Sequence, residues 1–235
     1  MKYILRPDQE RIHNKDDWKT SAYSFIPYQT HFGELCGFAD DIVNGGEGFG
    51  MHPHQNMEIS TIIISGAQAH KDNTGTEEVI TENCIQTMSA GTGLMHSEYN
   101  ASRTEAFHSF QIWVYPKKEN VKPRYEKFTY QPSAKINRVL LALSPDGRND
   151  TALINQESFF SVSCLEKNNS VLYKMNEKNN GVYIHCAKGI IIVEGNILNP
   201  GDAIGIYETD SIRLTGQETA ELIFVEVPML KGVKL

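Results

Sequence analysis

The chain consists largely of short runs of β-branched and aromatic residues separated by turn-forming residues. Residues 60–64, 110–115 and 223–227 are three such runs, rich in the Ile, Val, Thr, Tyr and Phe that favour strands. Clusters of turn-forming residues lie between these runs, for example Asn73-Thr74-Gly75 and Asn199-Pro200-Gly201. No long segment keeps a 3.6-residue period, so any helices are expected to be short. This pattern predicts an all-β protein built as a sandwich or a closed barrel.

The strand pattern is interrupted once, between about residues 120 and 135, where Pro123, a charged stretch and Pro132 occur. On each side of this interruption the chain repeats the same order of strand, turn, strand and glycine-containing turn. A chain of 235 residues is long enough for two small β domains. We therefore expect two tandem domains, residues 1–122 and residues 135–235.

Composition narrows the class of protein. Hydrophobic residues make up 40% of the chain and charged residues 22%, which is typical of a packed domain and not of a disordered one. The net charge of −7 argues against direct binding of nucleic acid. No apolar run is long enough for a signal-peptide core or a membrane span. The four cysteines are scattered, so we expect reduced, mostly buried thiols in a cytoplasmic protein. Two paired domains in one chain lead us to expect a monomer.

Two pairs of side chains carry candidate chemistry: His52 with His54, and His96 with Glu98. The members of each pair are two residues apart, so they face the same side of a strand. Each pair follows a glycine-rich segment, which permits the tight corners of a small barrel. If both faces point into one barrel, three imidazoles and one carboxylate converge, a donor set that suits iron, manganese, nickel, copper or zinc. A single His-x-His is unremarkable among eight histidines, but the joint occurrence of both pairs favours a metal site.

These segments resemble those of a known family. Residues 46–58 are similar to the first cupin motif, a glycine followed by His-x-His and a glutamate, and residues 93–100 are similar to the second. The stretches HPHQNMEI, MSAGTGLMHSEYN, FQIWVYP and PRYE look like those of the pirin family, and LALSPDGR resembles the start of its second barrel. Pirins are bicupins and include bacterial quercetin 2,3-dioxygenases. The resemblance extends over nearly the whole chain and implies two tandem, jelly-roll-like cupin β-barrels with few short helices.

The resemblance also implies a ligand set. His52, His54, His96 and Glu98 would hold one divalent metal, with iron(II) expected first and manganese, nickel, copper and zinc as alternatives. In cupins generally the glutamate of the first motif, here Glu58, is the ligand. The pirin pattern assigns that role to Glu98 and leaves Glu58 as a neighbouring residue or an alternative ligand. The C-terminal domain is expected to lack metal ligands.

The activity implied by the resemblance is cleavage of a flavonol such as quercetin by O2 with release of carbon monoxide. Glu98 would serve both as a metal ligand and as the base that takes the proton of the substrate 3-hydroxyl. Gln111 is of special interest, because a buried amide needs a hydrogen-bonding partner. Gln55-Asn56 departs from many relatives, which carry a basic residue first, and this pair lies beside the metal loop, where it would alter the rim of the pocket. The residues expected to line the substrate pocket, for which ordinary barrel packing is the alternative, are Phe49, Met51, His108, Phe110, Gln111 and Trp113.

The sequence alone is compatible with three other functions. The chain could be a metal-binding or redox-sensing regulator that acts through a protein partner and turns over no substrate. It could also be a cupin isomerase or hydrolase that uses zinc. A structural bicupin with a vestigial site is the third alternative, and the complete set of four ligand-type residues argues against it.

Overall fold

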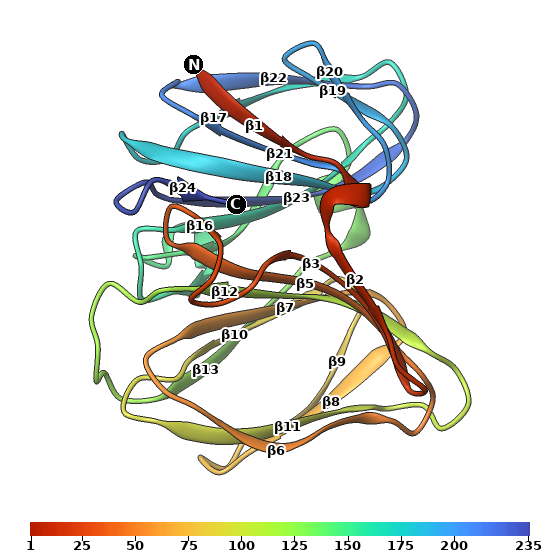
Figure 1. Cartoon of the computed structure of the whole chain (residues 1–235), viewed down its shortest axis with the longest axis vertical. Helices are drawn as coiled ribbons and strands as arrows, with labels where there is room; N and C mark the ends of the chain where they lie inside the picture. The colour runs from red at the N-terminus through yellow and green to blue at the C-terminus, as the bar shows by residue number, and fades with distance from the viewer.

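The computed structural model describes all 235 residues, and β-strands make up almost all of its regular structure (Figure 1). The only helices are three short 3-10 segments, η1 (Asp8–Glu10), η2 (Pro132–Lys135) and η3 (Arg148–Asp150). Each half of the chain forms a large sheet and a smaller four-stranded sheet that face each other. The predicted all-β class and the two tandem cupin domains are therefore confirmed.

The strands of the N-terminal half are β2 (Ile12–Lys15), β3 (Lys19–Phe25), β4 (His31–Phe32), β5 (Leu35–Val43), β6 (Gly48–His54), β7 (Glu58–Ser65), β8 (Ala67–Asp72), β9 (Glu77–Thr81), β10 (Cys84–Ser89), β11 (Leu94–Asn100), β12 (Phe107–Val114) and β13 (Arg124–Thr129). The larger sheet has the order β13-β10-β7-β12-β5-β3-β2, and β4 joins it beside β5. The smaller sheet has the order β6-β11-β8-β9. Between β5 and β12 the chain passes repeatedly from one sheet to the other, as expected for a jelly roll.

The strands of the C-terminal half are β14 (Leu140–Ser144), β15 (Ala152–Leu153), β16 (Phe159–Leu165), β17 (Ser170–Lys174), β18 (Asn180–Lys188), β19 (Ile191–Val193), β20 (Asn196–Leu198), β21 (Ala203–Tyr207), β22 (Ser211–Gly216) and β23 (Ala220–Pro228). The larger sheet contains β21-β18-β23-β16-β14-β15, and the smaller one is β17-β22-β19-β20. Both termini cross to the other half. The first strand, β1 (Lys2–Arg6), pairs with β21, and the last, β24 (Val233–Lys234), pairs with β4.

The sheets therefore do not follow the predicted domain bounds of 1–122 and 135–235 at every point. Besides the exchanged termini, β13 lies after residue 122 and still pairs with β10 of the N-terminal half. Proline and charge mark an interruption in the strand pattern, but they do not indicate which sheet the flanking strand joins. The exchange ties the two halves together by backbone hydrogen bonds at both ends of the chain.

The two larger sheets pack face to face in the middle of the molecule, with β5, β7 and β12 against β16 and β23 (Figure 1). The contact is a hydrophobic cluster of 20 buried residues drawn from both halves, and its aromatic centre includes Phe38, Phe110 and Tyr183. Burial of this much apolar surface is the main force holding the halves together.

Two expectations about the whole chain can be compared with the structure. All four cysteines are free, and three of them are buried. None of the helices is long and apolar enough to cross a membrane.

Candidate metal centre

Three histidines meet inside the N-terminal barrel. Strands β6 and β11 pair in antiparallel register, which sets His96 opposite His52 and Leu94 opposite His54. The ring centroids of His52 and His96 are 4.4 Å apart, and each of these rings lies 4.8 Å from the ring of His54. One ligand nitrogen of each residue lies within 4.8 Å of the other two. The two-residue spacing and the strand pairing thus bring together the three imidazoles predicted from the sequence.

The chemical state of these imidazoles fits metal binding. Burial, with His52 adding repulsion, lowers the pKa of His54 to about 4. Burial and the neighbouring imidazoles lower the pKa of His96 to about 2, so both rings stay neutral at pH 7. His54 Nε2 and both ring nitrogens of His96 are buried without a hydrogen-bonding partner. Orphaned buried nitrogens are rare, and a divalent cation between the rings would satisfy them.

His52 has a second feature of a metal ligand. Its Nδ1 lies 2.7 Å from the carbonyl oxygen of Gly50, which can only accept a hydrogen bond. Nδ1 must therefore carry the proton and donate it, and Nε2 keeps its lone pair. Metal-binding histidines commonly donate their second N–H in this way, which fixes the tautomer and the ring orientation.

Glu98 lies deeper in the barrel, next to His96. The pairing of β11 with β6 shifts register between His96 and Glu98. The carboxylate accepts hydrogen bonds from Gln68 Nε2 (2.8 Å, to Oε1) and from Gln111 Nε2 (2.7 Å, to Oε2). Its Oε1 is 3.9 Å from His96 Nδ1. Burial raises the pKa of Glu98 to about 7, although the amide hydrogen bonds oppose the rise.

His70 is a functional candidate that the sequence reasoning missed. Together with His96 and Glu98 it forms a second buried cluster whose ligand atoms lie within 4.8 Å of one another. His70 Nε2 is 3.4 Å from Asp72 Oδ2, and the two side chains share a face of β8. The available signal was the His-x-Asp spacing, which has the same two-residue period as the predicted ligands. Nothing in a single sequence indicated that β8 would pair with β11.

The predicted pocket residues separate into two groups. Gln111 and Trp113 face the barrel interior, and the Trp113 ring lies edge-on to His54, with ring centroids 4.9 Å apart. Phe49 packs against Trp18, and Met51 is about half exposed at the rim. This side of the barrel opens into a cleft of about 750 Å³. Residues that line the cleft include Tyr28, His54, Gln55, Trp113, Tyr115 and Lys231.

Of the six predicted pocket residues only Trp113 lines this cleft, and His108 and Phe110 lie on the opposite face of β12, which corrects their assignment as pocket residues. His108 Nε2 contacts Asp40 Oδ1 at 2.5 Å. The Phe110 ring packs against Phe38 and His185, between the two halves of the molecule. Successive residues of β12 point to opposite faces, and the predicted list took residues from both faces.

Glu58 also faces the other half of the molecule. Its Oε2 accepts hydrogen bonds from Ser89 Oγ (2.7 Å) and from the backbone N–H of Asn155 (2.9 Å). It belongs to neither cluster of ligand-type side chains. The geometry therefore gives Glu58 a structural contact between the halves and does not support it as the alternative ligand.

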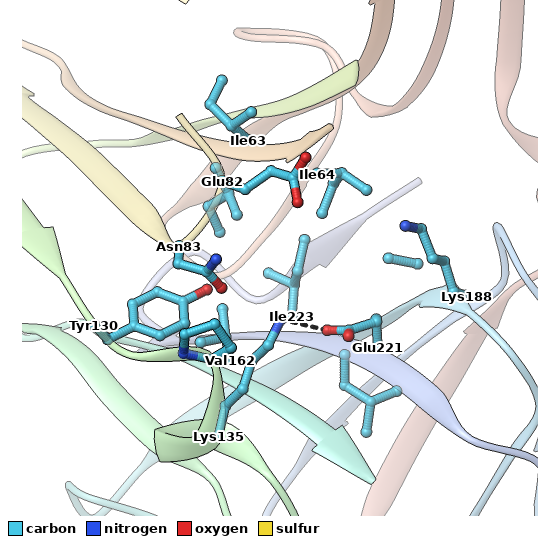
Figure 2. A pocket seen from close by; sticks show the side chains of 14 residues that line it. Ile63, Ile64, Glu82, Asn83, Tyr130, Lys135, Val162, Lys188, Glu221 and Ile223 are labelled. Atoms are coloured by element: carbon cyan, nitrogen blue, oxygen red, sulfur yellow. Dashed lines mark hydrogen bonds and ion pairs between the residues drawn. The ribbon is translucent and has the colours of Figure 1, made fainter. Parts of the chain in front are cut away.

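A second cavity lies between the halves, away from the histidines. It measures about 270 Å³, and isoleucine and valine side chains from both halves form its apolar wall (Figure 2). Lys135 and Glu221 form an ion pair of 2.5 Å at its edge. No histidine lines this cavity, whereas His54 lines both the larger cleft and a smaller hollow of about 380 Å³ on its other side.

Comparison with known proteins assigns the family. A family model described as Pirin matches residues 6–114, and one described as the quercetinase C-terminal cupin domain matches residues 141–227. Quercetin 2,3-dioxygenase of Escherichia coli (strain K12) is 31% identical over 230 residues, covering 95% of this chain and 98% of the relative. The chain belongs to the pirin family. A pirin-like protein of Caulobacter vibrioides is 31% identical over 206 residues, covering 87% of this pirin and 88% of the relative.

Solved structures agree with the family and the fold. YhhW from Escherichia coli superposes on this pirin with a TM-score of 0.90 at 30% identity, covering 97% of this chain and 98% of the other. A structure of the bacterial pirin YhhW in complex with nickel(II) gives a TM-score of 0.89 at 31% identity, covering 97% and 99% of the two chains. The predicted bicupin architecture is thus confirmed. The nickel complex shows that a member of the family binds a divalent metal.

Proposed function

We propose that this pirin is a metal-dependent dioxygenase that cleaves a flavonol such as quercetin with O2 and releases carbon monoxide. His52, His54, His96 and Glu98 would hold one divalent metal, with iron(II) as the first expectation. The observation that carries the proposal is the group of three converging imidazoles, with buried unpartnered nitrogens on His54 and His96, beside an aromatic cleft that His54 lines. The names of the similar proteins supply the reaction class.

The protein side chains have separate roles in this proposal. A divalent metal held here would act as a Lewis acid that favours the ionised form of a substrate hydroxyl. Burial raises the pKa of Glu98 to about 7 in the metal-free protein, so this carboxylate would accept the proton of that hydroxyl at neutral pH. Its complete burial keeps water away from the proton that it holds.

The cleft suits a flat polyphenol. Trp113, Tyr115 and Tyr28 supply aromatic surface on which a planar ring system can pack. Lys231 lies over the Tyr115 ring, 3.6 Å from its centroid, and donates a hydrogen bond to Glu34. Gln55 and Asn56 are uncharged, and Glu119 is the acidic residue that lines the same cleft. We infer that the aromatic wall gives affinity and that Lys231 favours ligands with an ionised phenol.

The test begins with the metal content of freshly purified protein. Elemental analysis is expected to find one divalent metal per chain. An oxygen electrode with a panel of flavonols is then expected to show O2 uptake, with carbon monoxide released in equal amount. Stoichiometric metal without O2 uptake on any flavonol would contradict the dioxygenase and leave the partner-binding regulator as the better proposal.

The monomeric state and the cytoplasmic location also remain predictions.

A further inference from the structure

A chain of hydrogen bonds connects the cleft to Glu98. Trp113 Nε1–H donates to Gln111 Oε1 at 2.9 Å, and Gln111 Nε2 donates to Glu98 Oε2 at 2.7 Å. An indole nitrogen can only donate, so the first bond fixes which end of the Gln111 amide faces the carboxylate. The far end of this chain is the Trp113 ring, which lines the cleft and touches His54.

The other oxygen of Glu98 is held independently. Gln68 Nε2 donates to Oε1 at 2.8 Å, from β8 on the opposite side of the carboxylate. Both oxygens of a side chain that is only 1% exposed are therefore fixed by amide donors. These two donors determine where the remaining lone pairs of the carboxylate point. In this arrangement Glu98 clusters with His70 and His96 and does not join the group of His52, His54 and His96.

We propose that Gln68 and Gln111 are positioning residues that set the orientation of Glu98, and that Trp113 transmits occupancy of the cleft to Glu98 through Gln111. A ligand that displaces the indole removes the donor that fixes the Gln111 amide. The Gln111 amide can then turn away from Glu98. The carboxylate is thereby released from one of its two amide donors and can turn toward the three histidines. This inference rests on the proposed metal site, and it extends that site to a substrate-sensing element.

The test uses cobalt(II) alone as a spectroscopic probe, because its visible absorption depends on the ligand geometry. Trp113→Phe keeps an aromatic ring beside His54 but deletes the N–H donor. Gln111→Leu deletes the amide, and Gln111→Met is a second variant if the leucine variant does not fold. Trp18→Phe is the matched control, because Trp18 is the other tryptophan of the chain and packs against Phe49.

We expect each variant to bind one cobalt ion per chain at saturating metal. The absorption bands should shift in the same direction in Trp113→Phe and in Gln111→Leu. The double variant should show the same bands as Gln111→Leu alone, because the two residues act in series. Gln68→Leu should shift the bands differently, since it frees the other oxygen. Trp18→Phe should match the parent. A Trp113→Phe spectrum identical to the parent, or additive shifts in the double variant, would overturn the proposal.

A kinetic measurement separates this inference from the proposed function. With quercetin and O2, kcat of Gln68→Leu should fall about 10-fold to 100-fold, the usual loss when a partner of a metal-site residue is removed, while KM changes little because Gln68 does not line the cleft. If the parent consumes no O2 but the cobalt spectra are coupled as expected, the dioxygenase proposal fails and the positioning chain stands. If the parent is active and the spectrum of Trp113→Phe is unchanged, the positioning chain alone fails.

Discussion

The two barrels of this pirin share one fold but fill their interiors differently. The C-terminal barrel contains a continuous cluster of 15 buried apolar residues. In the N-terminal barrel the apolar interior is divided into clusters of six and five residues. Between these two clusters lie buried polar side chains, among them Gln68, His70, Gln86, His96 and Glu98.

This difference shows what each barrel contributes. Polar groups are costly to bury, and several of those in the N-terminal barrel, such as His96, have no protein partner at all. Such an interior persists when function requires it, and stability is then provided elsewhere. Here the C-terminal barrel and the shared cluster of 20 residues supply the apolar burial. We therefore expect substitutions in the first barrel to affect chemistry and those in the second to affect folding.

The largest effect is expected from His96→Ala. The variant should lose most of its metal and all O2 uptake with a flavonol, because His96 lies in both clusters of ligand-type side chains. Elemental analysis of the purified variant provides the measurement. His13→Ala, which removes a half-exposed histidine far from the barrel interior, is the control and should keep its metal. Stoichiometric metal in His96→Ala would refute the ligand assignment.

Glu98→Gln tests chemistry in the first barrel without a change of size. Loss of a general base commonly lowers kcat by about 10²-fold to 10⁴-fold, and we expect a loss in that range. The three histidines should still hold metal, so metal content and O2 uptake should be measured on the same sample. Full activity in this variant would remove Glu98 from the role of base.

Phe224→Ala tests the second barrel. Phe224 is fully buried and stacks on Tyr173 with ring centroids 5.2 Å apart. Truncation of a buried phenylalanine costs about 3–5 kcal/mol, so urea unfolding should show a loss of that size. The matched substitution in the first barrel is Gln86→Met, which replaces a buried amide that has an unpartnered oxygen and should change stability by less than about 1 kcal/mol. Equal losses in the two variants would contradict the division of roles.

A smaller, pH-dependent effect is expected where the halves meet. His185 is fully buried, and burial, with a contribution from Arg11, lowers its pKa to about 3. The folded-state pKa lies below the unfolded value of about 6.5, so the stability from this group is present above pH 6.5 and is lost as the pH falls toward 3. Between pH 7 and pH 5 the parent should lose about 2 kcal/mol more than His185→Phe, as measured by urea unfolding at both pH values. Equal losses would mean that His185 is not held neutral by folding.

Much of this molecule could be predicted from its sequence because strands have a period of two. That period places His52, His54 and His96 on interior faces, and the turn residues delimit the strands between them. His108 and Phe110 alternate with Gln111 and Trp113 along β12, but the period alone does not say which of the two faces lines the cleft and which packs against the other half of the molecule. The position of His70 and the exchange of β1 and β24 depend on pairing between distant strands. Such pairing leaves little trace in a single sequence.

The most direct test is a crystal structure of the protein loaded with iron, with diffraction data collected at the iron absorption edge. The account predicts a single strong anomalous peak enclosed by the imidazoles of His52, His54 and His96, with a carboxylate oxygen of Glu98 in contact with the ion once a flavonol occupies the cleft. An anomalous peak at another place in the molecule, or no peak between those three rings in iron-loaded crystals, would contradict it.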